Sequence, residues 1–369
     1  MFYFLDKRIL SHFNYELILL ILPLVFLSHH LISEINEILA QKQLIYFLLS
    51  LTAFAVVFLI PFRKLTKFIP VIYWFGIFLL LCVEFFGITK LGATRWIAIP
   101  FTNMTIQPSE LFKPAFLLML GYLISTRPPG KFGYGLKDFF YFSFYILLPF
   151  VLIAKEPDLG TALVFLLVGY GVLFLIGINW KIIAFIVLIL GISSPVIYTY
   201  LIKDYQKKRI HDFISEEPSY HVKQSLIAIG SGGVLGKSKE EATQTQLKFL
   251  PIATSDFIFA SYAERFGLLG TVGLIFLYLL LIIYLLILHN LYKKDFLISV
   301  FASGLGLLLF LNMSVNILMV IGFAPVVGLP LPLFSYGGSS FINFIVLFGI
   351  LENLIAFRFM DSYSFNRKM

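Results

Sequence analysis

The feature that most constrains the fold is the segment 296–351, which contains no Asp, Glu, Lys or Arg. A soluble domain is typically about 25% charged, whereas this chain of 369 residues is 13% charged and 59% hydrophobic. About 20 apolar residues are enough for one helix to cross a membrane. The chain is therefore expected to be an all-α, polytopic membrane protein. A soluble enzyme, a disordered chain and a nucleic-acid-binding protein are excluded, despite the net charge of +8.

Apolar runs between charged or Pro/Gly-rich breaks predict about ten transmembrane helices. Together they form a single membrane domain, 1–369, with one large loop at 203–255 between the seventh and eighth helices. This loop is too short to be an independent catalytic domain. The expected spans are 15–32, 44–61, 69–88, 109–125, 139–154, 158–178, 181–202, 256–289, 296–323 and 339–358.

Basic residues in short loops predict the orientation, because cytoplasmic loops are enriched in Lys and Arg. With the N-terminus inside, half of the 28 basic residues fall in inner segments. The short outer loops hold only Lys42, Lys90, Arg95 and Lys155. We expect a multi-pass protein of the cytoplasmic (inner) membrane with both termini cytoplasmic. The polar, motif-like segments then all lie outside: 92–113, 155–161, 203–256 and 325–340.

The glycine-rich segment 230–238 suggests a phosphate-binding loop at first sight. That motif requires a glycine five residues before Gly236, where this chain has Ser231. ATP is also scarce outside the membrane, so a flexible glycine turn is the better interpretation. The six histidines show no metal-ligand spacing, and the identity of any metal stays open.

Charged residues at the outer ends of two predicted helices are the first candidates for a site. Glu110 and Lys113 are three residues apart and can pair on one helix face. Charged residues in membrane helices usually serve function or face a cavity, but a structural ion pair explains these two equally well. In the segment 155–161, helix capping would explain Glu156 and Asp158 without explaining Lys155.

Two further segments precede the eighth and tenth helices. Asp256 is expected in the first turn of its helix, where a lone Asp is most often a capping residue. Ser339 and Ser340 follow two glycines and are explained equally well as a turn and a cap. The residues alone therefore indicate an outward-facing polar site, and they do not identify its reaction.

Six segments taken together resemble the SEDS family of bacterial cell-wall proteins, typified by RodA and FtsW, and they occur in the family's order. The RodA branch is favoured, because the termini are short and the loop near Arg209 is RodA-like. The matching segments are GATRWI (92–97), QPSELFKPA (107–115), KEPDLGTA (155–162), QSLIAIGSGGVLGKS (224–238), SDFIFA (255–260) and PVVGLPLPLFSYGGSS (325–340).

The resemblance implies ten membrane helices with a large outer loop after the seventh. It also implies a peptidoglycan glycosyltransferase that polymerises lipid II, a disaccharide-peptide on undecaprenyl diphosphate, for cell elongation and shape. A class B penicillin-binding protein is the implied partner. The family's essential aspartate corresponds to Asp256. The family's Glu and His just before this aspartate are absent here, its GTQ segment begins with Ala242, and its second Glu after the aspartate is Arg265.

Lipid II is α-linked and the polymer is β-linked, so one inverting displacement suffices, with Asp256 as the expected general base. The leaving diphosphate requires cations, and a divalent ion, Mg or Mn, could assist. A lipid II transporter and a non-catalytic scaffold for wall synthesis are the alternatives. The expected substrate-binding residues are Arg95, Glu110, Lys113, Lys155, Asp158, Arg209, Ser339 and Ser340.

Overall fold

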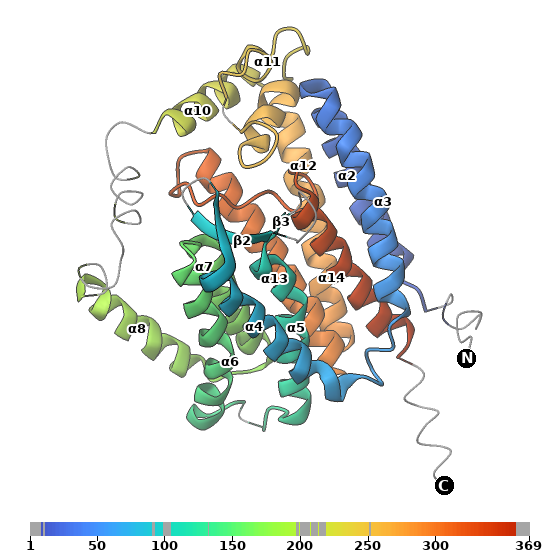
Figure 1. Ribbon diagram of the computed structural model, residues 1–369, viewed down its shortest axis with the longest axis vertical. Coiled ribbons are helices and arrows are strands. Elements are labelled where there is room, and N and C mark those ends of the chain that lie inside the picture. Colours follow the sequence, from blue (N-terminus) through green and yellow to red (C-terminus); the bar gives the residue numbers. More distant parts are fainter. Residues whose placement is uncertain are drawn as a thin grey trace.

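The computed structural model describes residues 9, 12–90, 93–98, 105–131, 133–196, 199, 207, 213, 219–250 and 252–358. Long helices form a bundle, with a small sheet and two shorter helices near one end (Figure 1). The long helices are α2 (Tyr15–Ile35), α3 (Glu37–Leu59), α4 (Ile69–Phe86), α5 (Pro108–Thr126), α6 (Leu136–Lys155), α7 (Leu159–Ile176), α8 (Trp180–Val196), α12 (Ile258–Leu291), α13 (Phe296–Val320) and α14 (Gly338–Ala356).

Each of the ten predicted spans corresponds to one of these helices. Eight helices in the described part of the chain are long and apolar enough to cross a membrane. The other two are α5, in which Glu110 and Lys113 are buried, and α8, which has 17 residues. The membrane protein is confirmed, and the count of ten crossings stays a prediction. The second helix begins at Glu37, earlier than expected, so Lys42 lies within it.

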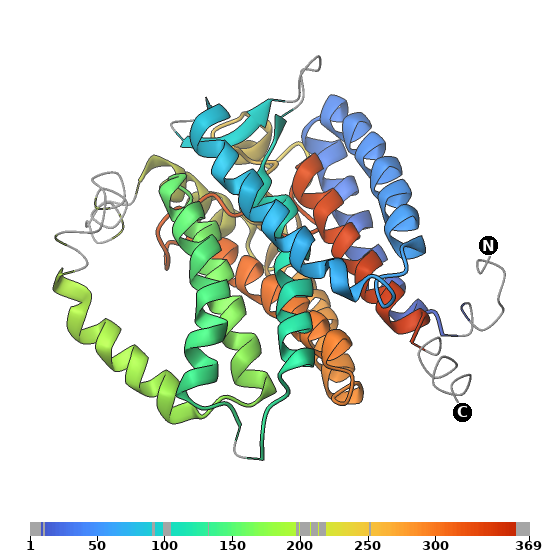
Figure 2. The same ribbon diagram turned by 60° about the horizontal axis from the view of Figure 1, so that its bottom comes forward.

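The charge-free stretch supplies the centre of the bundle. α13 packs against α5, α7 and α12. In the most apolar 18-residue stretch of α13, 78% is buried within the bundle, compared with 11% in the corresponding stretch of α3. Close packing depends on small residues, as is usual between membrane helices. A Cβ atom at Gly304 of α13 would lie 2.5 Å from the Leu117 side chain of α5. By contrast, α8 lies at the edge of the bundle (Figure 2), with Phe185 and Ile192 exposed.

The structure adds a three-stranded antiparallel sheet, which the all-α prediction did not include. Its strands are β1 (Gly87–Lys90), β2 (Ala93–Ala98) and β3 (Thr105–Ile106), in that order. Gly87 pairs with Ile97, which in turn pairs with Ile106. The strands are short because the chain only has to return from the end of α4 to the start of α5. The sheet fixes Arg95 on its central strand.

The glycine-rich segment begins in the last residues of α10 (Tyr220–Gly232) and continues from Gly233 as a turn toward α11 (Thr243–Gln246). It packs closely against α12. Gly267 interrupts α12 with φ +64°, which frees backbone groups for this contact. The Leu268 N–H donates to the Gly233 carbonyl at 2.9 Å. A Cβ atom at Gly236 would lie 2.3 Å from the Arg265 carbonyl oxygen. The predicted glycine turn is confirmed, but its glycines serve close packing rather than flexibility.

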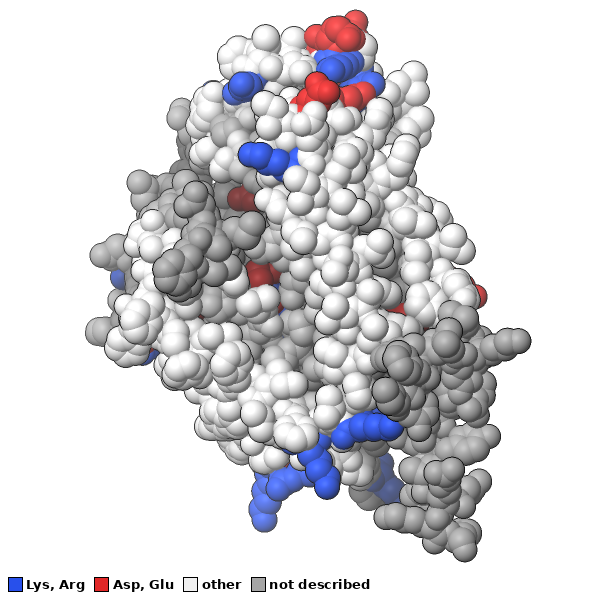
Figure 3. Space-filling view, turned by 45° about the vertical axis from the view of Figure 1, so that its right-hand side comes forward, with Lys and Arg blue, Asp and Glu red and all other residues white. Residues whose placement is uncertain are grey.

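The start of α2 and the end of α14 meet at the opposite end of the bundle. The Asn14 N–H donates to the Glu352 carboxylate. Arg63 pairs with Asp295 at 2.5 Å and donates to the Leu354 carbonyl at 2.9 Å. Lys and Arg gather at this end, and a broad, mostly white belt with only a few acidic atoms separates it from the mixed charges at the other end (Figure 3). This distribution agrees with a cytoplasmic assignment of the basic end.

Candidate active site

Helices α5, α7, α12 and α14 all begin at the end opposite the basic end, and their first residues are connected. Gln107, the N-cap of α5, donates from Nε2 to the Asp158 carboxylate, the N-cap of α7, at 3.0 Å. Ser335, before α14, donates to the Ser255 carbonyl, before α12, at 2.7 Å. Because helix N-termini carry partial positive charge, this end of the bundle favours an anionic ligand.

Asp256 lies in a turn two residues before α12. The N-cap of α12 is Phe257, and no side chain caps it. The expectation that Asp256 lies in the first helical turn is therefore wrong, and capping does not explain this residue. Instead, Asn316 of α13 donates to the Asp256 carbonyl at 2.9 Å and to the Leu329 carbonyl at 2.7 Å. The aspartate is thereby fixed to the central helix and to the segment before α14.

Burial raises the pKa of the Asp256 carboxyl above its usual value, while a hydrogen bond with Ser255 and the charge of Arg95 lower it in part. A carboxylate with a raised pKa is a stronger proton acceptor than an ordinary aspartate. The Oδ2 atom of Asp256 lies 3.5 Å from the position that a Cβ atom at residue 328 would occupy. Glycine at this position therefore leaves space beside the carboxylate.

Arg95 links the sheet to the start of α7. Its Nη1 lies 3.4 Å from Asp158 Oδ1, and its Nη2 donates to the Pro157 carbonyl at 2.5 Å. Its charge also acts on the pKa of Asp256 and of Glu156. Arg95 Nε is buried and has no hydrogen-bond partner among the described residues. Arg95 thus contacts the start of α7 through its two terminal nitrogens, and its Nε–H has no partner among the described residues.

Asp158 combines capping with ion pairing. Its carboxylate accepts the Thr161 N–H at 3.3 Å, which confirms the predicted cap. Pro157 precedes this N-cap and so lies outside the helix. Burial raises the pKa of Asp158, whereas Arg95 and Thr161 lower it. The same residue therefore starts α7 and orients Arg95.

The predicted ion pair of α5 is present. Lys113 Nζ lies 2.5 Å from Glu110 Oε1, and both residues are buried. The ammonium group also lies 5.4 Å from the centre of the Phe344 ring of α14, a favourable cation–π distance. The other carboxylate oxygen, Glu110 Oε2, is buried without a partner in the described structure. The pair is formed within α5, and the unpartnered oxygen offers an acceptor to a ligand.

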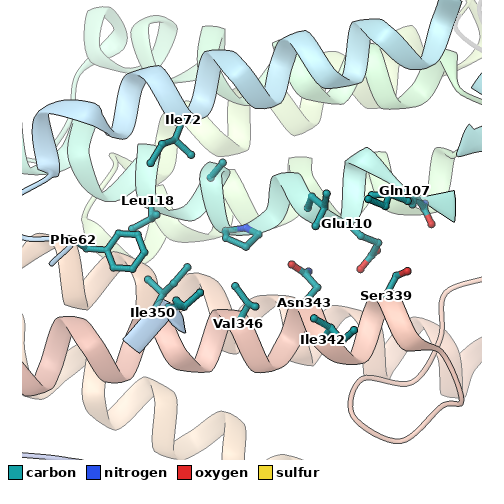
Figure 4. Close-up of a pocket in the computed structure, with 15 residues that line it drawn as sticks. Phe62, Ile72, Gln107, Glu110, Leu118, Ser339, Ile342, Asn343, Val346 and Ile350 are labelled. Atoms are coloured by element: carbon teal, nitrogen blue, oxygen red, sulfur yellow. The ribbon is translucent and has the colours of Figure 1, made fainter. Parts of the chain in front are cut away.

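A groove of about 410 Å³ lies between α5 and α14, and Glu110 is at its polar end. Gln107, Ser339 and Asn343 gather around this carboxylate, and the remaining lining is apolar (Figure 4). The buried Asn343 Nδ2 likewise lacks a partner among the described residues. The labelled apolar residues that line the groove are Phe62, Ile72, Leu118, Ile342, Val346 and Ile350.

Not every predicted site residue joins this arrangement. Lys155 ends α6 with an exposed side chain, and Ser340 is half-buried in the first turn of α14. Arg209 lies outside the described residues. Across the described ranges, no three His, Cys, Asp or Glu side chains gather closely enough to hold a metal ion. The described residues do not form a metal site, and a divalent ion stays a prediction.

Sequence reasoning missed several polar residues of the site. Glu156 was interpreted as a capping acid, yet it is buried and follows α6 as its C-cap. Gln107 begins one of the matching segments, but its contact with Asp158 was not predicted. Asn316 and Asn343 gave no signal beyond being polar residues in apolar surroundings, because their roles depend on which helices meet.

The departures from the family pattern have structural consequences. Glu264 accepts hydrogen bonds from the backbone of Gln244 and Thr245 at 2.9 and 3.0 Å, which docks the segment after Ala242 on α12. Arg265 pairs with Glu34 of α2, with Nε and Oε2 2.7 Å apart. The unusual Arg265 thus joins α2 and α12 at the end of the bundle opposite the basic end.

Comparison with known proteins agrees with this architecture. The family model for FtsW, RodA and SpoVE, described as "Cell cycle protein", matches residues 5–359. The chain is 51% identical over 360 residues to the peptidoglycan glycosyltransferase MrdB of Helicobacter pylori, covering 98% of this chain and 94% of that protein. It is 40% identical over 312 residues to MrdB of Escherichia coli K12, covering 83% and 82%.

Solved structures give the same result. A chain from a peptidoglycan synthase complex, described as coordinating polymerisation and crosslinking, matches with a TM-score of 0.80 and 26% identity, covering 95% of this chain and 99% of that one. The rod shape determining protein RodA of Thermus thermophilus matches with a TM-score of 0.71 and 26% identity, covering 94% and 98%. The chain therefore belongs to the FtsW/RodA/SpoVE family of cell cycle proteins.

Proposed function

We propose that this protein is a peptidoglycan glycosyltransferase that polymerises lipid II into glycan strands on the outer face of the cytoplasmic membrane. Its relatives in Helicobacter pylori and Escherichia coli carry that activity in their names. The observation that carries the proposal is the buried Asp256 carboxyl within the field of Arg95, at the end of the bundle where four helices begin. A largely apolar groove has its polar end at Gln107 and Glu110, where one of these helices, α5, begins. This combination suits a substrate with a lipid chain, a diphosphate and a sugar.

The groove between α5 and α14 suits the lipid part of the substrate. It is apolar along most of its length, and Glu110 and Asn343 supply one acceptor and one donor at its polar end. An isoprenoid chain packs against apolar side chains and requires no polar partner there. The head group would then lie at the helix N-termini, close to Arg95.

Asp256 acts as the general base in this proposal. As the acceptor sugar's 4-hydroxyl oxygen bonds to the anomeric carbon of the donor, its proton passes to the Asp256 carboxylate. The bond between that carbon and the diphosphate oxygen breaks, and the diphosphate leaves with the electron pair. A single displacement inverts the α-link to a β-link. Arg95 stabilises the negative charge that develops on the leaving group.

The distribution of basic residues supports an orientation of the protein in the membrane. The basic end, where α2 begins and α14 ends, is assigned to the cytoplasm, with both termini on that side. A class B penicillin-binding protein is the proposed partner, supported by the similarity to a chain of a peptidoglycan synthase complex. A reporter fused after residue 369 should read cytoplasmic, and one inserted at Lys239 should read external.

Polymerisation of purified lipid II by the purified protein, with and without a class B penicillin-binding protein, tests the proposal. We expect glycan strands of many disaccharides. A transporter would move lipid II between leaflets without forming a glycosidic bond, and a scaffold would leave lipid II unchanged. Either result would contradict the proposal.

A further inference from the structure

Glu156 is a buried carboxyl that the mechanism above does not use. It follows α6 and lies two residues before the Asp158 cap of α7, and only 6% of its surface is exposed. Both of its carboxyl oxygens are buried without a hydrogen-bond partner among the described residues. Burying a polar group without a partner is costly, and an unpaired carboxylate is costlier still. Its position therefore requires a ligand, a proton or both.

The charges around Glu156 favour a proton. Burial and the charge of Asp158 raise the pKa of Glu156 to about 8, and Arg95 lowers it only in part. Arg95 already pairs with Asp158 and with the Pro157 carbonyl. Asp256, on the turn before α12, shares the field of the same Arg95. A third ionised carboxylate would leave this part of the site with excess negative charge before an anionic substrate arrives.

A protonated Glu156 and Arg95 would present complementary donors. Arg95 Nε is a buried N–H without a partner among the described residues, and a protonated Glu156 carboxyl adds an O–H donor within the field of the same arginine. Together, these two donors suit a ligand that has several acceptor oxygens and a negative charge. A diphosphate has this chemistry, whereas a sugar hydroxyl alone would not use both donors so well.

We propose that Glu156 is a further substrate-binding residue: its protonated carboxyl donates a hydrogen bond to a diphosphate oxygen beside Arg95 Nε. This inference rests on the proposed function, since it assumes a diphosphate-linked substrate. Glu156 keeps its proton throughout, so it is neither the acid nor the base of the reaction. Ionisation of Glu156 at high pH would remove the donor and add a repelling charge.

Glu156→Gln and Glu156→Ala separate this role from a structural one, because glutamine keeps a donor of similar shape and cannot ionise. At pH 7, Glu156→Ala should lower kcat/KM for lipid II by at least about tenfold, and Glu156→Gln should rescue most of that loss. The wild-type rate should fall as the pH rises through about 8. Glu156→Gln should lack this alkaline decline. Glu37→Gln, at an exposed acid near the same end of the bundle, is the matched control.

Binding of undecaprenyl diphosphate, measured by native mass spectrometry, provides a readout independent of polymerisation. Glu156→Ala should weaken binding at pH 7, and raising the pH to 9 should weaken binding to the wild type but not to Glu156→Gln. Unchanged binding and rates in Glu156→Ala would overturn the proposal. So would a Glu156→Gln variant that folds normally and is as inactive as the alanine variant. If the wild type binds undecaprenyl diphosphate with the expected pH dependence but does not polymerise lipid II, that result would count against the proposed function alone.

Discussion

Nη1 of Arg95 on strand β2 lies 3.4 Å from Oδ1 of Asp158, the residue that caps α7. This contact joins the small sheet to a membrane helix and positions the cation whose charge acts on the pKa of Asp256. A residue of the sheet thus becomes part of a site built on helix ends.

Arg95→Lys should reduce activity even though this substitution keeps the positive charge. All three donors of lysine lie on one nitrogen, so lysine cannot reach Asp158, the Pro157 carbonyl and a ligand at separate positions as the planar guanidinium can. We expect kcat/KM to fall by about tenfold or more, the loss of one charge-assisted hydrogen bond. Steady-state polymerisation of lipid II measures this change. A lysine variant with the wild-type rate would show that Arg95 acts only through its charge.

Lys113→Ala should reduce the amount of folded protein as well as its activity. Its partner, Glu110, is buried 2.5 Å away, and removing one partner of a buried pair costs about 3–5 kcal/mol. The double variant Glu110→Gln, Lys113→Met should recover much of the abundance, because no unpaired charge remains. Detergent-extracted yield and thermal melting measure this recovery. Normal abundance of Lys113→Ala without activity would instead indicate direct contact with the diphosphate.

Filling the groove should weaken binding of the lipid chain. Ala115 of α5 lines the groove, and Ala115→Phe adds bulk there. We expect a higher KM for undecaprenyl-linked substrate and a smaller effect with a short-chain analogue. Leu51→Phe, on the exposed surface of α3, is the control for general effects of added bulk. Equal losses with both substrates would show that the groove does not hold the chain.

The pH dependence on the acid side should report Asp256. A general base must be unprotonated, so the rate should fall as the pH decreases through the pKa of Asp256. Because burial raises this pKa above the usual value of 3.8, the midpoint of the acid limb in kcat/KM should lie above 3.8. A midpoint at or below that value would disagree with the buried position of the carboxylate.

The parts of the fold that depend on local sequence were predictable. Apolar runs predicted the long helices, and the spacing of Glu110 and Lys113 predicted their ion pair.

The parts that depend on tertiary contact were not predictable. The sheet that holds Arg95 has strands of two to six residues, too short for a clear alternating pattern. Asn316 reaches the Asp256 backbone from α13. The short connection between α12 and α13 predicts that these helices are neighbours, but not which side chain of α13 meets the turn before α12. Likewise, the residues around Glu156 do not indicate that its side chain is buried.

Asp256→Asn tests the central claim most directly. Asparagine keeps the size of the side chain, and the contact with Asn316 uses the backbone carbonyl of residue 256, which is unchanged. We therefore expect normal abundance, normal thermal melting and normal binding to the penicillin-binding partner. A general base contributes about 10²–10⁴-fold to the rate, so polymerisation of purified lipid II should fall by that factor. An Asp256→Asn variant that polymerises lipid II at nearly the wild-type rate would contradict the account.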